Sequence, residues 1–148
     1  MMFSKLNLPY VDFKTKLVGG DTQVFDVVRK KYFKLTAEEW VRQHFIHYLN
    51  TNKQYPFSLM GIEKTITYNG LRKRADIILY NTSGIPIMIV ECKAPEVEIT
   101  QATFDQIARY NFTLKVKYLV VTNGKKHFCC VMDYEQEEIN FLRNIPNF

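Results

Sequence analysis

Two acidic residues and a lysine lie on neighbouring strand-like segments of this sequence, Asp76 on the first and Glu91 and Lys93 on the second. Residues 81–84 between the segments have the composition of a tight turn. If the segments form a hairpin centred between residues 83 and 84 of this turn, the numbers of any two facing residues sum to 167. Asp76 then faces Glu91. Lys93 shares their face, because side chains alternate along a strand. The sequence therefore predicts two carboxylates and an amine at one end of a hairpin.

This arrangement suits metal-dependent chemistry. Facing carboxylates on paired strands have Cβ atoms about 5 Å apart, and they repel each other unless a cation lies between them. Mg²⁺ is typically held by one or two carboxylates together with water and phosphate oxygens, and Mn²⁺ could substitute. The backbone carbonyl of Cys92 could add a third protein oxygen, and Lys93 could orient or deprotonate an attacking water. These are the groups needed to hydrolyse a phosphodiester.

A structural interpretation of the same residues stays open. Lys93 could neutralise Asp76 or Glu91 as an ion pair at the end of a sheet, since acids and lysines are common and their spacing alone is weakly specific. The apolar strand before Glu91 and the facing position of Asp76 favour the catalytic interpretation.

A helix that could position a further acid is predicted to begin after Thr36 and to run to about Asn50. Thr36 fits the N-cap of a capping box, with Glu39 at the third helical position. At about 100° per residue, four residues form one apolar face: Val41, Phe45, Tyr48 and Leu49. Glu38 falls near the middle of that face, and an inward carboxylate needs a partner. We therefore prefer Glu38 over Glu39 as the acid directed toward the site, and the choice stays open.

The remaining predicted elements surround this hairpin. Strands are expected at residues 59–68, 73–80, 85–93, 117–122 and 127–133, a less regular extended segment at 24–33, and a second helix at about 100–115. The acidic residues 135–138 are expected to start a short terminal helix. The strands at 73–80 and 85–93 are apolar on both faces, as in central strands covered by helices. The order β-α-βββ-α-ββ predicts an α/β fold with a mixed sheet between helices.

The length and charge of the chain set further limits. Its 148 residues suit a single domain over 1–148, with an irregular N-terminal arm at 1–20 and a C-terminal tail at 135–148. The net charge of +5 permits a polyanionic partner without requiring one. No apolar run approaches the roughly 20 residues of a membrane span, and the first residues lack a signal-peptide core. We expect no membrane association and a cytoplasmic location.

The cysteines and two histidines give no competing site. Cys92, Cys129 and Cys130 are expected to be reduced and buried, as in cytosolic proteins. His44 and His47 are three residues apart on the helix, on the face opposite the predicted core, and no third ligand is evident. Zinc is therefore not expected.

Several motifs together resemble a known family. The pattern Asp76…Glu91-Cys92-Lys93 resembles the PD-(D/E)XK nuclease superfamily. The segments TAEEWVRQ (36–43), RADI (74–77), IVECK (89–93) and Gln106-x-x-x-Tyr110 resemble, more closely, the N-terminal nuclease domain of type I restriction enzyme R subunits. The resemblance covers about residues 35–122. It implies a restriction-endonuclease-like fold, a mixed central β-sheet flanked by helices, and Mg²⁺-dependent hydrolysis of DNA.

The resemblance also assigns roles within the active site. Asp76 and Glu91 match the metal-binding acids of the family, Lys93 matches the catalytic lysine, and Glu38 matches the acid of the first helix. No base specificity is expected of the domain itself. The proline that often precedes the family's aspartate is Ala75 here, a minor change because no chemistry depends on that ring.

Four further residues are candidates for contact with nucleic acid. Gln106 and Tyr110 match the family motif that supports the active site and contacts DNA, and residues four apart share a helix face. Their alternative is a helix flank that packs on the sheet. Arg72 and Arg74 precede Asp76 and could bind backbone phosphates, although charge clusters are more often solvated.

The sequence lacks the motor that accompanies the nuclease in family R subunits. No Gly-x-x-x-x-Gly-Lys-Ser/Thr phosphate loop is present, so any ATP-driven translocation is expected to come from elsewhere. Partners would be DNA and restriction-modification subunits, and a homodimer is compatible with the sequence. The rival interpretations are a nuclease fold that binds DNA or a partner subunit without cutting, and a structural domain whose acids and lysine form ion pairs.

Overall fold

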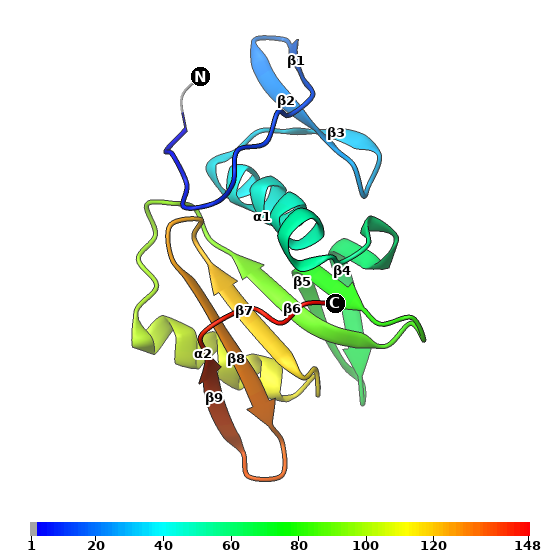
Figure 1. Ribbon diagram of the computed structural model, residues 1–148, viewed down its shortest axis with the longest axis vertical. Helices are drawn as coiled ribbons and strands as arrows, with labels where there is room; N and C mark the ends of the chain where they lie inside the picture. The colour runs from blue at the N-terminus through cyan, green and yellow to red at the C-terminus, as the bar shows by residue number, and fades with distance from the viewer. Residues whose placement is uncertain (1–2) are drawn as a thin grey trace.

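The computed structural model describes residues 3–148 (Figure 1), so the first two residues of the expected arm lie outside it. It contains two sheets, two α-helices and a short 3-10 helix. In chain order the elements are β1 (Thr15–Val18), β2 (Asp21–Asp26), β3 (Lys31–Lys34), α1 (Ala37–Lys53), η1 (Phe57–Leu59), β4 (Met60–Tyr68), β5 (Leu71–Tyr80), β6 (Pro86–Cys92), α2 (Gln101–Phe112), β7 (Tyr118–Thr122), β8 (His127–Asp133) and β9 (Glu138–Leu142).

The larger sheet confirms the predicted mixed α/β fold. Its six strands are ordered β4-β5-β6-β7-β8-β9, and every neighbouring pair is antiparallel except β6 and β7. Parallel neighbours need a crossover connection, and α2 lies in the segment between β6 and β7. Helix α1 covers one face of this sheet and α2 the other (Figure 1).

The central strands are apolar on both faces, as predicted, because each face forms a separate core. Toward α1, Ile77 and Val90 pack with apolar residues of that helix. Toward α2, Ile78 and Ile89 pack with Phe104 of α2. Burial against both helices therefore stabilises β5 and β6 as interior strands of the sheet, and the candidate site lies at one end of these two strands.

Helix α1 begins as predicted, but its buried acid is Glu39. Thr36 accepts a hydrogen bond from the backbone N–H of Glu39 at 3.0 Å. Glu39 is only 5% exposed, whereas the side chain of Glu38 is 47% exposed. The expectation that Glu38 points toward the core is therefore wrong. Capping uses only the backbone of Glu39, and its carboxylate turns inward to Arg29 and Arg42, each of which pairs with it.

The N-terminal region is more ordered than predicted. Residues 3–14 are irregular, but β1, β2 and β3 form a separate antiparallel sheet, so the arm is shorter than expected and residues 24–33 are not one extended segment. The chain turns after β2 because the Asp26 carboxylate accepts the N–H groups of Val28 and Arg29, both at 2.8 Å. Lys30 completes this turn in the left-handed region with φ +56°.

The C-terminal tail forms a strand, and the predicted terminal helix is wrong. Asp133 accepts the N–H groups of Glu135 and Gln136, and Glu137 is left-handed, which closes a turn. Strand β9 then pairs with β8. The apolar side chain of Ile139, which packs against the α2-side core, favours this outcome over a helix.

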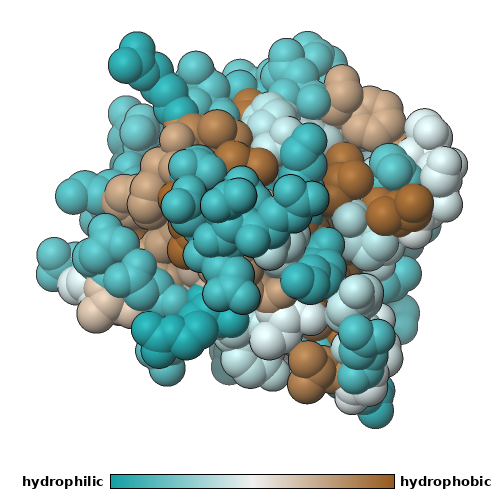
Figure 2. Space-filling model, turned by 90° about the horizontal axis from the view of Figure 1, so that it is seen from below, coloured by the Kyte–Doolittle hydropathy of each residue, from teal (hydrophilic) through white to brown (hydrophobic). Residues whose placement is uncertain are grey.

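The surface and the cysteines agree with the composition. Figure 2 shows one face on which hydrophilic residues predominate and hydrophobic residues are exposed in separate areas. None of the helices in residues 3–148 is long and apolar enough to cross a membrane. Cys92, Cys129 and Cys130 are free and buried, as predicted.

Candidate active site

The expected hairpin forms, with one shift in its register. Asn81 shapes the turn by accepting the N–H groups of Ser83 and Ile85. Ile78 faces Ile89, as the sum of 167 requires. An irregularity after Leu79 pairs Tyr80 with Pro86, so the expected pairing of Tyr80 with Ile87 is wrong.

Asp76 stands outside the backbone pairing on both sides. The β4–β5 ladder passes from Ile62↔Ile77 to Lys64↔Ala75, and the β5–β6 ladder ends at Ile77↔Val90. The expected ladder pair of Asp76 with Glu91 is therefore not formed. Two local features explain this: Glu63, opposite Asp76 on β4, is left-handed at φ +51°, and the Asp76 carboxylate accepts the Cys92 N–H at 2.7 Å.

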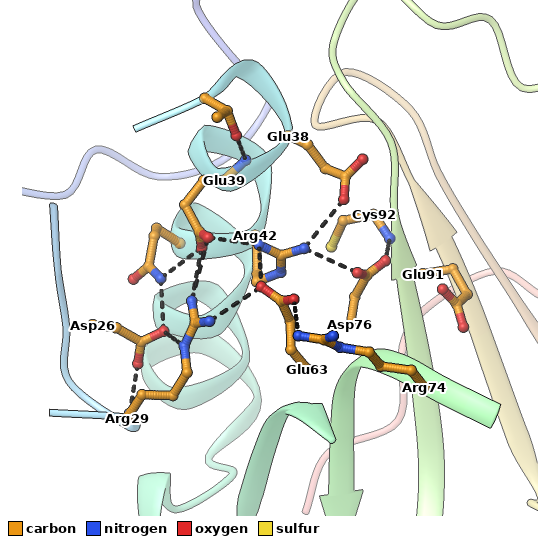
Figure 3. Close-up of polar contacts among 12 residues, drawn as sticks. Asp26, Arg29, Glu38, Glu39, Arg42, Glu63, Arg74, Asp76, Glu91 and Cys92 are labelled. Carbon is orange, nitrogen blue, oxygen red and sulfur yellow. Dashed lines mark hydrogen bonds and ion pairs between the residues drawn. The ribbon is translucent and has the colours of Figure 1, made fainter. Parts of the chain in front are cut away.

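Arg42 of α1 connects Asp76 to the first-helix acid (Figure 3). Its Nη2 donates to Asp76 Oδ1 at 3.0 Å and to Glu38 Oε1 at 3.1 Å. Partial burial raises the pKa of Glu38, and the negative charge of Asp76 raises it further. Glu38 thus lies beside Asp76 at the rim of the site, although it does not face the core.

Glu91 lies next to Asp76 on the neighbouring strand and is paired with Lys73. Burial raises the pKa of Glu91 to about 7, the Lys73 ammonium opposes this shift, and the Asp76 carboxyl adds to it through its charge and a hydrogen bond. The two carboxyl groups are therefore neighbours, although their backbones are unpaired. The sequence marks Lys73 only as part of the basic cluster that it forms with Arg72 and Arg74, and its pairing with Glu91 was not predicted.

A pocket of about 430 Å³ lies on the α2 side of these strands. Glu91 and Lys93 line it, as do the four predicted nucleic-acid residues: Arg72, Arg74, Gln106 and Tyr110. Asp76 is not among the lining residues, since it points toward Arg42 and α1. The structure therefore brings Glu91 and Lys93 together in one pocket and places Asp76 and Glu38 beside it, so the expectation that Asp76 shares the face of Glu91 and Lys93 is wrong.

A network of ion pairs extends from Asp76 to the small sheet. Arg42 also pairs with Glu39 at 2.7 Å and with Glu63 at 3.3 Å, and Arg29 pairs with Asp26 at 2.8 Å. Five carboxylates share only three arginines, Arg29, Arg42 and Arg74, among these contacts. The excess of negative charge favours a further cation nearby.

The donor atoms at this site suit a hard divalent ion. Carboxylate and carbonyl oxygens are the ligands of Mg²⁺, which commonly uses one or two carboxylates and completes its shell with water and phosphate. In a strand the N–H and C=O of one residue point the same way, so Cys92 directs its carbonyl toward the edge where its N–H meets Asp76. No group of three or more His, Cys, Asp or Glu side chains within residues 3–148 is arranged as a metal site. Two carboxylates, Asp76 and Glu91, and the Cys92 carbonyl could at most supply part of the ligand set of such an ion.

The mixed sheet between two helices defines an α/β protein, and the candidate acids and lysine lie near one end of β5 and β6. Residues 37–146 match the family described as "Type I restriction enzyme R protein N terminus (HSDR_N)". Because the match spans most of the chain, the chain belongs to this family. The small sheet, β1 to β3, precedes the matched region.

A solved structure shares the fold. It is described as the fragment structure of a putative HsdR subunit of a type I restriction enzyme from Vibrio vulnificus YJ016. The similarity has a TM-score of 0.54 at 24% sequence identity, and it covers 76% of this chain and 24% of that chain. The chain thus corresponds to about a quarter of that protein's length. No curated protein matches the chain.

Proposed function

We propose that the chain is a metal-dependent nuclease that hydrolyses phosphodiester bonds in DNA. The observation that carries this proposal is the junction of β5 and β6, where Asp76 lies beside Glu91 and Lys93 lines the same pocket as Glu91. Membership in the type I restriction R protein N-terminal family supports it. The substrate class, the metal and the role of each residue are parts of the proposal.

Each side chain has a distinct task at this site. Asp76 and Glu91 would hold Mg²⁺, or Mn²⁺ in its place, with the Cys92 carbonyl. The ion would supply a Lewis acid and a water of lowered pKa. Lys93 has no ion-pair partner among the described residues, so its ammonium is available to orient the attacking water and to stabilise charge on the phosphate oxygens.

The substrate would be held by the exposed side of the pocket. Gln106 is exposed and Tyr110 is 54% exposed on the same helix, one turn apart, where they can contact a DNA strand. Arg72 and Arg74 reach the pocket from β5 and would bind backbone phosphates, since arginine can donate two hydrogen bonds to one phosphate. Glu38 would act through Arg42, which fixes the position of the Asp76 carboxylate.

A second candidate is a domain that binds DNA without cutting it. In this structure Arg42 and Lys73 already neutralise Asp76 and Glu91. If those ion pairs persist when DNA is bound, no metal enters and the pocket serves only for binding. Partner subunits would then provide the cleavage.

Cleavage assays separate the two candidates. Plasmid and short single- and double-stranded DNA are incubated with Mg²⁺, Mn²⁺ or chelator. The nuclease proposal expects metal-dependent cutting that Lys93→Ala reduces about 100-fold or more, because a lost catalytic proton or charge contact costs rates of this order. Lys115→Ala, which removes an exposed lysine elsewhere, should leave cutting unchanged.

Metal binding gives an independent measurement. Titration of Mn²⁺ followed by electron paramagnetic resonance should show a bound ion that Asp76→Asn weakens. The absence of cutting, together with salt-sensitive DNA binding that Gln106→Ala weakens, would instead support the binding domain.

A further inference from the structure

The small sheet, β1 to β3, has one outer face that carries lysines and aromatic rings. Paired residues of an antiparallel sheet share a face, and the register aligns Lys16 with Gln23, and Gln23 with Lys34. The next row on this face pairs Phe25 with Tyr32. Lys14 extends that row, because its carbonyl accepts the Phe25 N–H at 2.9 Å.

This region accounts for most of the net positive charge of the chain. Residues 1–34 contain seven Lys or Arg and three Asp, a net charge of +4 out of +5 for the whole sequence. One of the aspartates, Asp26, is fully buried and bound to Arg29, so it does not offset the outer face. Asp21 pairs with Lys34 only at 3.9 Å, with both side chains more than half exposed. The outer face is therefore strongly basic.

The aromatic rings hold two of the lysines in place. The Lys16 ammonium lies 4.1 Å from the centre of the Tyr32 ring, and that of Lys14 lies 5.3 Å from the Phe25 ring. The two rings also contact each other edge to face at 5.3 Å. Because such contacts restrict the long side chains, the ammonium groups are presented in a defined row with little further loss of entropy on binding.

The inner face fixes the sheet to the rest of the molecule. Val24 is fully buried, and the Asp26 carboxylate accepts a hydrogen bond from Gln43 of α1 at 2.8 Å. Arg29 joins the same contacts to Glu39 of α1. In Figure 1 the sheet lies on the far side of α1 from the six-stranded sheet, so its outer face is turned away from the core.

We propose that the outer face of the small sheet binds the sugar-phosphate backbone of DNA. Three exposed ammonium groups, Lys14, Lys16 and Lys34, of which aromatic rings hold the first two, match a polyanion with regularly spaced charges. This proposal goes beyond the proposed hydrolysis, because it concerns residues outside the family match and needs neither metal nor cleavage.

The lysines have a competing explanation in the architecture. β1 and β3 are the two edges of a small sheet, and lysines on edge strands prevent pairing with other chains. In that case their removal would promote self-association and leave the affinity for DNA unchanged.

The test measures binding of a short fluorescent DNA duplex by anisotropy in chelator. The triple variant Lys14→Gln/Lys16→Gln/Lys34→Gln should bind about tenfold more weakly or worse. The slope of log K against log salt should fall by about 2 to 3, since each phosphate contact contributes about one. Chelator prevents metal-dependent cutting, so the result does not depend on whether the proposed nuclease activity exists.

A matched control removes the same charge elsewhere. Lys115→Gln/Lys117→Gln/Arg143→Gln changes three exposed cations outside the small sheet and should bind within about twofold of the original protein. If the first triple variant does not fold, as judged by circular dichroism, the single exposed change Lys16→Glu serves in its place. Equal affinities for the small-sheet variant and the control would overturn the proposal.

Discussion

At the scale of single residues, Arg42 connects more carboxylates near the site than either Arg29 or Arg74 does. It is buried, and its guanidinium pairs with carboxylates of Glu38, Glu39, Glu63 and Asp76. Arg42→Ala would leave several of these carboxylates close together without their common partner. We expect a loss of about 3 kcal/mol or more in the free energy of unfolding, measured by urea denaturation.

Arg74 provides the comparison for this prediction. It pairs with Glu63 at 2.6 Å, but its side chain is 67% exposed. Arg74→Ala should therefore cost less than about 1 kcal/mol in the same measurement. Similar losses for the two variants would contradict the view that burial makes Arg42 central to the network.

The sequence predicted which candidate site residues lie near one another better than it predicted the contacts that each of them makes. Asp76, Glu91 and Lys93 could be placed near one another because the hairpin turn and strand alternation are local features. Helical periodicity favoured Glu38 as the inward acid and was wrong, since the burial of Glu39 depends on Arg29, which a distant segment supplies. The pairing of Lys73 with Glu91 likewise depends on register and on side-chain reach, which the sequence does not specify.

At the scale of elements, the turn between β7 and β8 holds the N-terminal arm. Gly124 has φ +85°, and its carbonyl accepts the Asn7 N–H at 2.8 Å. A Cβ on Gly124 would lie 2.7 Å from Leu6 Cδ2 and 3.2 Å from Val41 Cγ2, both in the core. Gly124→Ala would therefore combine a left-handed alanine with a clash against the arm.

Gly84 separates these two effects. It is also left-handed, at φ +76°, but has open space around its Cβ position. Gly84→Ala should cost about 1 kcal/mol from the backbone alone, and Gly124→Ala at least about 1 kcal/mol more. Urea midpoints measure both, and equal losses would show that the contact with Leu6 adjusts freely.

Elements with strong local signals were predicted from the sequence, and those that depend on tertiary contacts were not. The cap of α1 at Thr36 and the apolar strands β5 and β6 follow from short motifs and periodicity. Strand β9 was mistaken for a helix because residues 135–138 are acidic and polar, and pairing with β8 decides the outcome. Strand β1, exposed throughout, carries no burial pattern that could reveal it.

At the scale of the whole molecule, three histidines contact the N-terminal arm. The rings of His44 and His47 contact Phe13 edge to face, and His127 donates from Nε2 to the Asn7 carbonyl at 3.0 Å. Burial lowers the pKa of all three histidines. The face of α1 that was expected to lie opposite the core is thus covered by the arm, and His44 is buried there.

These shifts predict how stability changes with pH. A histidine whose folded pKa lies below its unfolded value of about 6.5 stabilises the protein fully above that pH and progressively less as the pH falls below it. Glu91, with its pKa raised to about 7, acts in the opposite direction over the same range. A histidine variant and the original protein both contain Glu91, so the contribution of Glu91 to the pH dependence of stability cancels when the two are compared.

His44→Phe is the informative variant. As the pH falls from 7.5 to 5.5, the His44 ring increasingly gains a proton when the original protein unfolds. The variant has no group at this position that can gain a proton. The urea midpoint of His44→Phe should therefore fall less over this range than that of the original protein. An equal fall in both would mean that His44 titrates in the folded state as it does in the unfolded chain.

The burial of all three thiols has a practical consequence for spectroscopy. Burial raises the pKa of Cys129 to about 11 and of Cys130 to about 12, and Cys92 is shifted in the same direction, so native thiols resist alkylation. Maleimide dyes can therefore be directed to introduced positions such as Leu17→Cys on β1 and Arg109→Cys on α2, both of which are exposed. Energy transfer between such a dye pair would report, in real time, whether the two parts of the molecule move as one body when a duplex is added.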